Sequence, residues 1–202
     1  MFKSRKRSLS SIPMEEVPAP LEAEGDVEIA PLPPELRVVG LFGEVSEKKA
    51  EELIYSLLLL ANDGLEDIEI YVSSQGGAAI DMFAIYDVMR LIREKVDIST
   101  IGIGKTMSAA VMLLASGTKG KRKIGKYCRV MLHSVIAGNH GTLHDLDNEM
   151  KEIKYTQEKY IEVLHKETKL TKKQIKEIFS KNVNTYLSAE EAVKYGIADE
   201  IV

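Results

Sequence analysis

All six prolines of this 202-residue chain lie within its first 34 residues. Proline lacks a backbone N–H donor and interrupts helices and the inner strands of sheets. The residues that follow can therefore form uninterrupted helices and strands, and they are numerous enough to enclose a substantial core. The prolines thus predict an N-terminal segment, residues 1–35, followed by one folded domain, residues 36–202.

The N-terminal segment combines prolines with serines, a basic stretch and then an acidic stretch. Such a composition buries little apolar surface, and no apolar signal-peptide core follows the basic start. We therefore expect residues 1–35 to form a mobile arm or a propeptide-like extension.

Within the domain, short apolar runs alternate with segments whose apolar residues follow helical spacing. This alternation predicts an α/β fold with a largely parallel sheet. Strands are expected over 37–42, 68–72, 98–103, 121–124 and 129–132. Helices are expected over 46–63, 79–93, 108–116 and 142–167, after Thr171, and from Ser188 to Gly196. A tight turn is expected at 73–77. The inner face of the helix over 79–93 is expected to carry Ile80, Phe83, Ala84, Val88, Leu91 and Ile92.

The composition excludes several classes of protein. The 27 basic and 31 acidic side chains nearly balance, which argues against a dedicated nucleic-acid binder. Cys128 is the only cysteine, so we expect neither a disulfide framework nor a cysteine-based zinc site, and the protein is expected in a reducing compartment. Cys128 itself is expected to be a small buried side chain. No apolar run reaches the roughly 20 residues that a membrane-spanning helix needs. These features predict a cytoplasmic protein without nucleic-acid or membrane partners.

The glycine-rich sequence over 102–106 resembles the end of a phosphate-binding loop. Such a loop needs a glycine five residues before Gly104, and Ser99 stands there instead. Residues 100–103 are also predicted to be a strand, whereas a phosphate cradle needs free backbone amides. We therefore expect no bound nucleotide and no other cofactor, and any ATP would be used by another chain.

Ser108 is the first candidate for nucleophilic chemistry. It follows a predicted strand and a glycine turn and begins a predicted apolar helix, where serine is commonly a helix N-cap. The same position also gives a nucleophile nearby backbone amides that stabilise an oxyanion. The small side chains of Ala109 and Ala110 would let a substrate approach. The residues alone therefore leave two interpretations of Ser108, a cap and a nucleophile.

The histidines are less informative on their own. His133 ends a predicted strand, where a histidine is more often structural than a catalytic base, and His165 is expected to be structural. The candidates for a metal site are His140, His144, Asp145 and Asp147. Their spacing matches no known site, so we expect a solvated start of a helix there.

Five blocks of residues occur in a specific order and spacing. They are Tyr71–Gly77, Ile85–Asp87, Gly104–Ala110 with Gly117–Arg122, Arg129–His133, and Tyr186–Ala192 with Tyr195, Gly196 and Asp199. Together they resemble the Clp protease family, ClpP, of the crotonase-like superfamily, over residues 36–202. The resemblance implies a βα superhelical fold with a mostly parallel sheet and a protruding helical handle at about 134–168.

The resemblance also implies an activity and the residues that perform it. The activity is that of a serine endopeptidase, which degrades unfolded polypeptides through an acyl-enzyme. Ser108 would be the nucleophile, His133 the general base, and Asn184 would take the place of the third triad member. The backbone amides of Gly77 and Ala109 would form the oxyanion hole. The substrate would bind beside Gly76, Ala78, Ala79, Ser134, Val135 and Ile136.

Three positions depart from the family pattern. Gln75 replaces the usual proline, and Ala109-Ala110 replaces the frequent Met-Gly, which preserves a backbone donor. Asn184 stands where the family has an aspartate. Asparagine accepts a hydrogen bond from histidine but supplies no charge for the imidazolium. The loop before it is longer than usual, so Asn182, or an acid from elsewhere, is the alternative third member.

The family implies a homo-oligomer of two stacked seven-membered rings, a tetradecamer, with the handle region between the rings. An AAA+ unfoldase of the Clp type would deliver substrates and consume the ATP. Asn184 motivates an alternative, a catalytically weak or inactive ring subunit. A phage head-maturation protease of the same fold is another alternative, and so is a crotonase-fold enzyme acting on acyl-CoA, against which the pairing of Ser108 with His133 argues.

Overall fold

The computed structural model describes residues 36–138, 140–181 and 183–202. The predicted arm at 1–35 therefore lies outside the described residues, and the described ones form one unit, Leu36–Val202. The strands are β1 Val38–Val45, β2 Ile68–Gly77, β3 Ile98–Met107, β4 Arg122–Ile124, β5 Arg129–Leu132, β6 Thr185–Leu187 and β7 Glu200–Ile201. The helices are α1 Glu47–Asp63, α2 Ala79–Ile92, α3 Ala109–Ala115, α4 Leu143–Glu167, α5 Lys172–Ser180 and α6 Ala189–Lys194.

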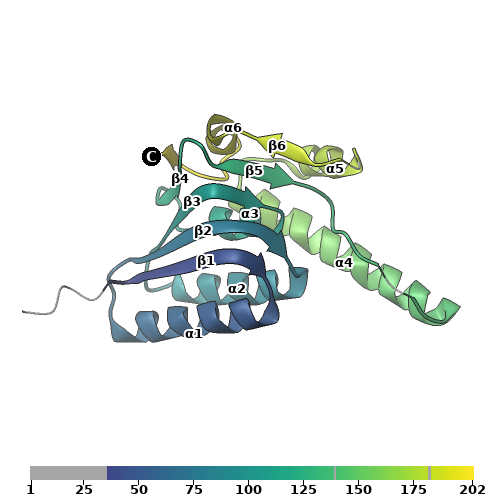
Figure 1. Cartoon of the computed structure of the whole chain (residues 1–202), viewed down its shortest axis with the longest axis horizontal. Helices are drawn as coiled ribbons and strands as arrows, with labels where there is room; N and C mark the ends of the chain where they lie inside the picture. Colours follow the sequence, from purple (N-terminus) through teal and green to yellow (C-terminus); the bar gives the residue numbers. More distant parts are fainter. Residues whose placement is uncertain (1–35, 139, 182) are drawn as a thin grey trace, which may run out of the picture. The chain divides into compact units, whose positions relative to one another are not determined.

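The strands form one seven-stranded sheet in the order β1-β2-β3-β4-β7, with β5 paired to β3 and β6 paired to β5 (Figure 1). Among the described strands, only β5 and β6 pair antiparallel. Helices α1 and α2 lie together against one face of β1–β3 (Figure 1). The predicted α/β class with a mostly parallel sheet is therefore confirmed.

Strand β3 divides its pairing between two neighbours. Thr100–Gly102 pair with β4, whereas Lys105–Met107 pair with β5. The register with β2 shifts between these halves, where Gly104 adopts a φ of +63°. Glycine tolerates that left-handed conformation. The strand thus continues through the glycines to Met107, and the glycine turn expected before Ser108 is wrong.

Strand β2 also extends further than predicted. The residues over 73–77, expected to form a tight turn, continue the strand and pair with β1 as far as Val45 opposite Gly77. The register shifts between Phe42 and Glu44 of β1, where β2 contains one residue more than β1. The prediction of a turn failed because glycines mark bulges in strands as well as turns.

The inner face of α2 differs from the prediction in part. As predicted, Ile92 is buried, and Phe83 and Val88 are partly buried against the core. Met82, Ile85 and Met89 are also buried, whereas Ile80 is 65% exposed and Leu91 is 64% exposed. Apolar residues occupy both faces of this helix, so helical spacing alone could not select the face that packs on the sheet. The exposed residues on the outer face remain available for contacts outside this chain.

Helix α4 confirms the long helix predicted over 142–167. It begins with a capping box between Thr142 and Asp145. Its C-terminal half is packed on the domain through Thr156, Tyr160, Ile161, Leu164 and Glu167, which are buried. Its N-terminal half extends away from the sheet (Figure 1). This projecting half is the helical handle.

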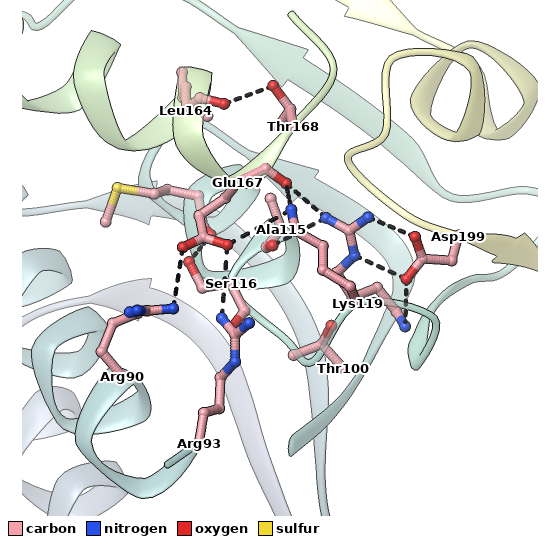
Figure 2. A network of polar contacts seen from close by, with 12 residues as sticks. Arg90, Arg93, Thr100, Ala115, Ser116, Lys119, Leu164, Glu167, Thr168 and Asp199 are labelled. Atoms are coloured by element: carbon pink, nitrogen blue, oxygen red, sulfur yellow. Dashed lines mark hydrogen bonds and ion pairs between the residues drawn. The ribbon is translucent and has the colours of Figure 1, made fainter. Parts of the chain in front are cut away.

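A buried acid fixes the C-terminal end of α4. Glu167 is 1% exposed and accepts a hydrogen bond of 3.0 Å from the hydroxyl of Tyr86. Arg90 of α2 and Arg93, the residue after this helix, lie 3.8 and 3.6 Å from its carboxylate, and Lys119 lies at 3.6 Å (Figure 2). A buried carboxylate needs such partners. The cluster therefore holds the end of α4 against α2.

A second ion pair joins β4 to the segment before β7. The Arg122 guanidinium donates to both carboxylate oxygens of Asp199, at 2.8 and 2.5 Å, and also to the carbonyl of Glu167, at 2.7 Å. Burial alone would raise the pKa of Asp199, but hydrogen bonds from Arg122 and from the Gly120 amide lower that pKa to about 2. The charged carboxylate is thus favoured in the folded protein.

This pair predicts a pH-dependent stability. A carboxyl whose pKa falls on folding stabilises the folded state above its unfolded pKa of about 3.9. That contribution disappears as the pH falls through about 2. We expect Asp199→Asn to lower the free energy of unfolding by about 2 kcal/mol at pH 7. The difference from the unsubstituted protein should shrink between about pH 4 and pH 2.

Urea unfolding at several pH values measures both effects. The matched control is Asp147→Asn, which removes an exposed carboxylate paired with Lys151 one helical turn away. Exposed ion pairs contribute little to stability, so this variant should unfold like the unsubstituted protein. An Asp199→Asn protein as stable as the control at pH 7 would contradict the role assigned to the buried pair.

Candidate active site

A cavity of about 330 Å³ opens where β1, β2 and β3 end. Every predicted oxyanion-hole and substrate-binding residue lines it, together with the predicted nucleophile and base: Gly76, Gly77, Ala78, Ala79, Ser108, Ala109, His133, Ser134, Val135 and Ile136. Glu44, Gln75, Met82 and Tyr160 complete the lining. The carboxyl ends of parallel strands are the usual place for a site in α/β proteins.

Ser108 lies between the last residue of β3 and the first residue of α3. Its φ of 53° and ψ of −124° make it the only non-glycine residue with a positive φ among the described ones. It takes the N-cap position of α3, yet its side chain makes no capping hydrogen bond. The interpretation as a side-chain cap is therefore wrong. A strained serine on a strand-to-helix turn is typical of nucleophiles.

The sheet pairing brings His133 to the same place. Met107 pairs with Met131 across β3 and β5, and the Ser108 amide donates to the Met131 carbonyl at 2.8 Å. His133 follows β5 directly, just as Ser108 follows β3. Two parallel neighbours thus deliver a serine and a histidine to one edge of the sheet.

The half-buried imidazole of His133 has a hydrogen-bond partner in its own segment. Its Nδ1 lies 2.5 Å from the carbonyl oxygen of Ser134. Because a carbonyl only accepts hydrogen bonds, Nδ1 carries the proton. The neutral ring therefore keeps its lone pair on Nε2, which is the tautomer that a general base for a serine needs.

Gly76 lets β2 approach the serine closely. A Cβ on Gly76 would lie 2.6 Å from Cβ of Ser108 and 2.7 Å from the Met107 carbonyl. The φ of Gly76 is +91°, which also disfavours a side chain. A larger residue would therefore push β2 away from Ser108.

Gly77 and Ala109, whose amides are predicted to form the oxyanion hole, line the same cavity. Gly77 has a φ of +151°, and a Cβ there would meet the carbonyl of Val45 at 2.1 Å. Ala109 is the first residue of α3, so its N–H has no acceptor within the helix. Both backbone segments therefore lie beside Ser108, where donors could stabilise negative charge.

Asn184 lies outside the main cavity but shares a smaller one with His133. The two residues line a separate cavity of about 140 Å³, together with Ser134, Ile136, Phe179 and Val183. Asn184 reaches this place because β6, which begins at Thr185, pairs with Leu132 of β5. The described residues include no hydrogen bond between His133 and Asn184. Its role as the third member stays a prediction, and Asn182 lies outside the described residues.

Tyr160 is a site residue that sequence reasoning missed. It belongs to α4, lines the cavity and donates a hydrogen bond of 2.9 Å from its hydroxyl to the carbonyl oxygen of Ser108. In the sequence it is one of several apolar residues at helical spacing, which indicates only a core position. No local signal connects it with Ser108, which lies 52 residues earlier.

The other residues considered in the sequence, among them His165 and Cys128, make contacts of a structural kind. His165 Nδ1 lies 2.8 Å from the Leu170 carbonyl, as expected of a structural histidine. Cys128 is buried, and this burial raises the pKa of its thiol, whereas a hydrogen bond with Thr106 acts in the opposite direction. No cluster of three potential metal ligands occurs in the described part of the chain.

None of the described helices combines the length and the apolar character needed to cross a membrane.

The comparison with known families agrees with the geometry. The family model described as Clp protease matches residues 32–202, which include every strand and helix described above. The matched range contains the cavity with Ser108 and His133 and the projecting half of α4. The chain therefore belongs to the Clp protease family.

Proposed function

We propose that this protein is a serine endopeptidase, the proteolytic subunit of a Clp-type compartmentalised protease that degrades unfolded polypeptides. The observation that carries the proposal is the state of Ser108. Its backbone is strained, its side chain makes no capping hydrogen bond to α3, and it lines one cavity with His133. Membership of the Clp protease family supports the same chemistry.

In the proposed reaction, Nε2 of His133 takes the proton of Ser108 as Oγ attacks the peptide carbonyl. The amides of Gly77 and Ala109 stabilise the oxyanion of the tetrahedral intermediate. Protonated His133 then gives its proton to the departing amine, which leaves an acyl-enzyme on Ser108. Water, activated by His133, hydrolyses the ester and restores the free serine. No step requires a cofactor.

Exposed apolar side chains support the proposed ring assembly. On the projecting half of α4 they are Leu143, Leu146 and Met150, which share one face at spacings of three and four residues. On α1 and α2 they are Tyr55, Leu58, Leu59, Ile80 and Leu91. Apolar surface of this kind is typical of protein–protein contacts. We propose that the apolar face of α4 joins two stacked rings. We propose that the apolar residues of α1 and α2 join neighbouring subunits within a ring.

The test uses the purified full chain with a fluorogenic peptide and, separately, with a stably folded protein. We expect the assembled particle to hydrolyse the peptide without ATP. We expect it to degrade the folded protein only with a Clp-type AAA+ unfoldase and ATP, because the unfoldase rather than this chain would use the nucleotide. An assembled particle that hydrolyses no peptide would contradict the proposal.

Asn184 distinguishes a fully active enzyme from a weak or inactive ring subunit. A carboxylate beside His133 would stabilise the imidazolium that forms during the reaction. We expect Asn184→Asp to raise kcat by about 3- to 10-fold, an effect of about 1 kcal/mol at a partly exposed site.

The control is Asn184→Ala, measured with the same peptide. We expect it to keep kcat within about threefold, because the Ser134 carbonyl still holds the Nδ1 proton of His133. No increase with aspartate would mean that the side chain at 184 does not face His133. A protein inactive in all three forms would favour the inactive ring subunit.

A further inference from the structure

The peptide unit that joins Ser108 to Ala109 carries two functions of the candidate site. Its carbonyl belongs to the predicted nucleophile, and its N–H belongs to a predicted oxyanion donor. A peptide unit is planar, and the described chain contains no cis peptide bond. The carbonyl and the N–H therefore point in opposite directions, so a contact that fixes one also fixes the other.

Two groups donate to this carbonyl. The Val111 amide donates to the Ser108 oxygen at 2.9 Å, as part of the turn that begins α3. The Tyr160 hydroxyl donates to the same oxygen at 2.9 Å from α4. The first bond is local to the turn, whereas the second connects the turn to a separate element of the fold.

Tyr160 is held firmly in its place. It is 4% exposed, and its ring stacks on Phe179 of α5 with centroids 5.6 Å apart and an interplanar angle of 18°. Burial raises the pKa of the Tyr160 phenol, so the hydroxyl stays protonated and remains a donor.

We infer, on the basis of the proposed function, that Tyr160 is a positioning residue that sets the direction of the Ala109 N–H toward the oxyanion. Ser108 occupies a strained backbone conformation, with a φ of 53°, that persists only where its surroundings enforce it. The Tyr160 hydroxyl enforces it from outside the turn. A donor on the carbonyl also polarises the peptide unit, which makes the N–H a stronger donor.

The effect of Tyr160 on the Ala109 N–H acts on the transition state rather than on the bound peptide. The oxyanion exists only after Oγ of Ser108 has attacked, so a misdirected Ala109 N–H affects the chemical step more than binding of the peptide. A tyrosine that merely fills the core would not separate these two effects. Its replacement would change stability without changing the balance between kcat and KM.

The experiment compares Tyr160→Phe with Tyr86→Phe in the full chain. Each variant removes one buried phenol hydroxyl and keeps the ring, and the Tyr86 hydroxyl bonds to Glu167, away from the cavity. The readouts are kcat and KM for a fluorogenic peptide, inhibition by a peptide aldehyde, and thermal melting. The aldehyde adds to Ser108 Oγ, and the oxygen of the resulting hemiacetal takes the oxyanion position.

We expect Tyr160→Phe to lower kcat by about 3- to 10-fold, the range set by one hydrogen bond, with KM changed by less than about twofold. The affinity for the aldehyde should fall by the same factor as kcat. We expect Tyr86→Phe to melt at a lower temperature but to keep both kcat and aldehyde affinity within about twofold.

Two outcomes would overturn the role of Tyr160. One is a Tyr160→Phe protein with the kcat and aldehyde affinity of the unsubstituted enzyme. The other is a Tyr86→Phe protein that loses as much kcat as Tyr160→Phe. Ser108→Ala separates this inference from the proposed function. If Ser108→Ala hydrolyses the peptide as fast as the unsubstituted protein, the proposed function fails. If it is inactive while Tyr160→Phe is fully active, only the role of Tyr160 fails.

Discussion

Replacing Ser108 by alanine is expected to lower peptide hydrolysis by about 10⁴-fold or more, the loss typical of removing a serine nucleophile. Alanine cannot form the acyl-enzyme, so only stabilisation of the oxyanion and binding of the peptide would remain. The substitution removes a hydroxyl that makes no capping bond, so the fold should be retained. The measurement is kcat/KM for a fluorogenic peptide with the full chain.

Ser56→Ala is the matched control for this variant. The Ser56 hydroxyl lies on the exposed surface of α1, where it donates to the Glu52 carbonyl at 2.8 Å. Its removal should leave hydrolysis unchanged. Equal rates for Ser108→Ala and the control would remove Ser108 from the mechanism.

Replacing His133 by alanine is the second large effect, with an expected loss in kcat of about 10⁴-fold. This substitution removes Nε2, the group proposed to take the proton of Ser108 and to protonate the departing amine. The double variant with Ser108→Ala should be no worse than either single variant, because the two residues act as one unit.

His144→Ala is the control for the loss of an imidazole, since His144 is exposed near the start of α4. We expect it to hydrolyse the peptide at the unsubstituted rate. A His133→Ala enzyme that keeps more than about a tenth of the original kcat would show that another group acts as the base.

The sequence predicted the framework of the site because the framework follows from local patterns and from the order of the motifs. Alternating strands and helices indicated the α/β class, and the motif blocks placed Ser108, His133 and the glycines of β2 in one family pattern. Their meeting depends on parallel pairing of β3 with β5, which aligns Met107 with Met131. Strand β4 lies between these two strands in the chain, so their pairing does not follow from the general tendency of successive strands to pair.

Other features could not be read from the sequence because they depend on contacts between distant segments. Register shifts occur close to the glycines of β2 and β3, but both strands continue to pair with their neighbours beyond the shifts, so the turns expected there are wrong. The buried face of α2 is selected by the sheet beneath it rather than by its own apolar spacing. The bond from Tyr160 to Ser108 joins α4 to the turn before α3, and no spacing along the chain encodes it.

The identity of the nucleophile is tested most directly by treating the protein with a fluorophosphonate, a reagent that modifies active serines, and mapping the labelled peptide. Attack of the serine Oγ on phosphorus expels fluoride and leaves a stable covalent adduct. We predict one adduct per chain, on Ser108, absent from Ser108→Ala and formed much more slowly by His133→Ala. An adduct on any other residue, or an assembled protein that hydrolyses peptides while Ser108 stays unmodified, would contradict the account.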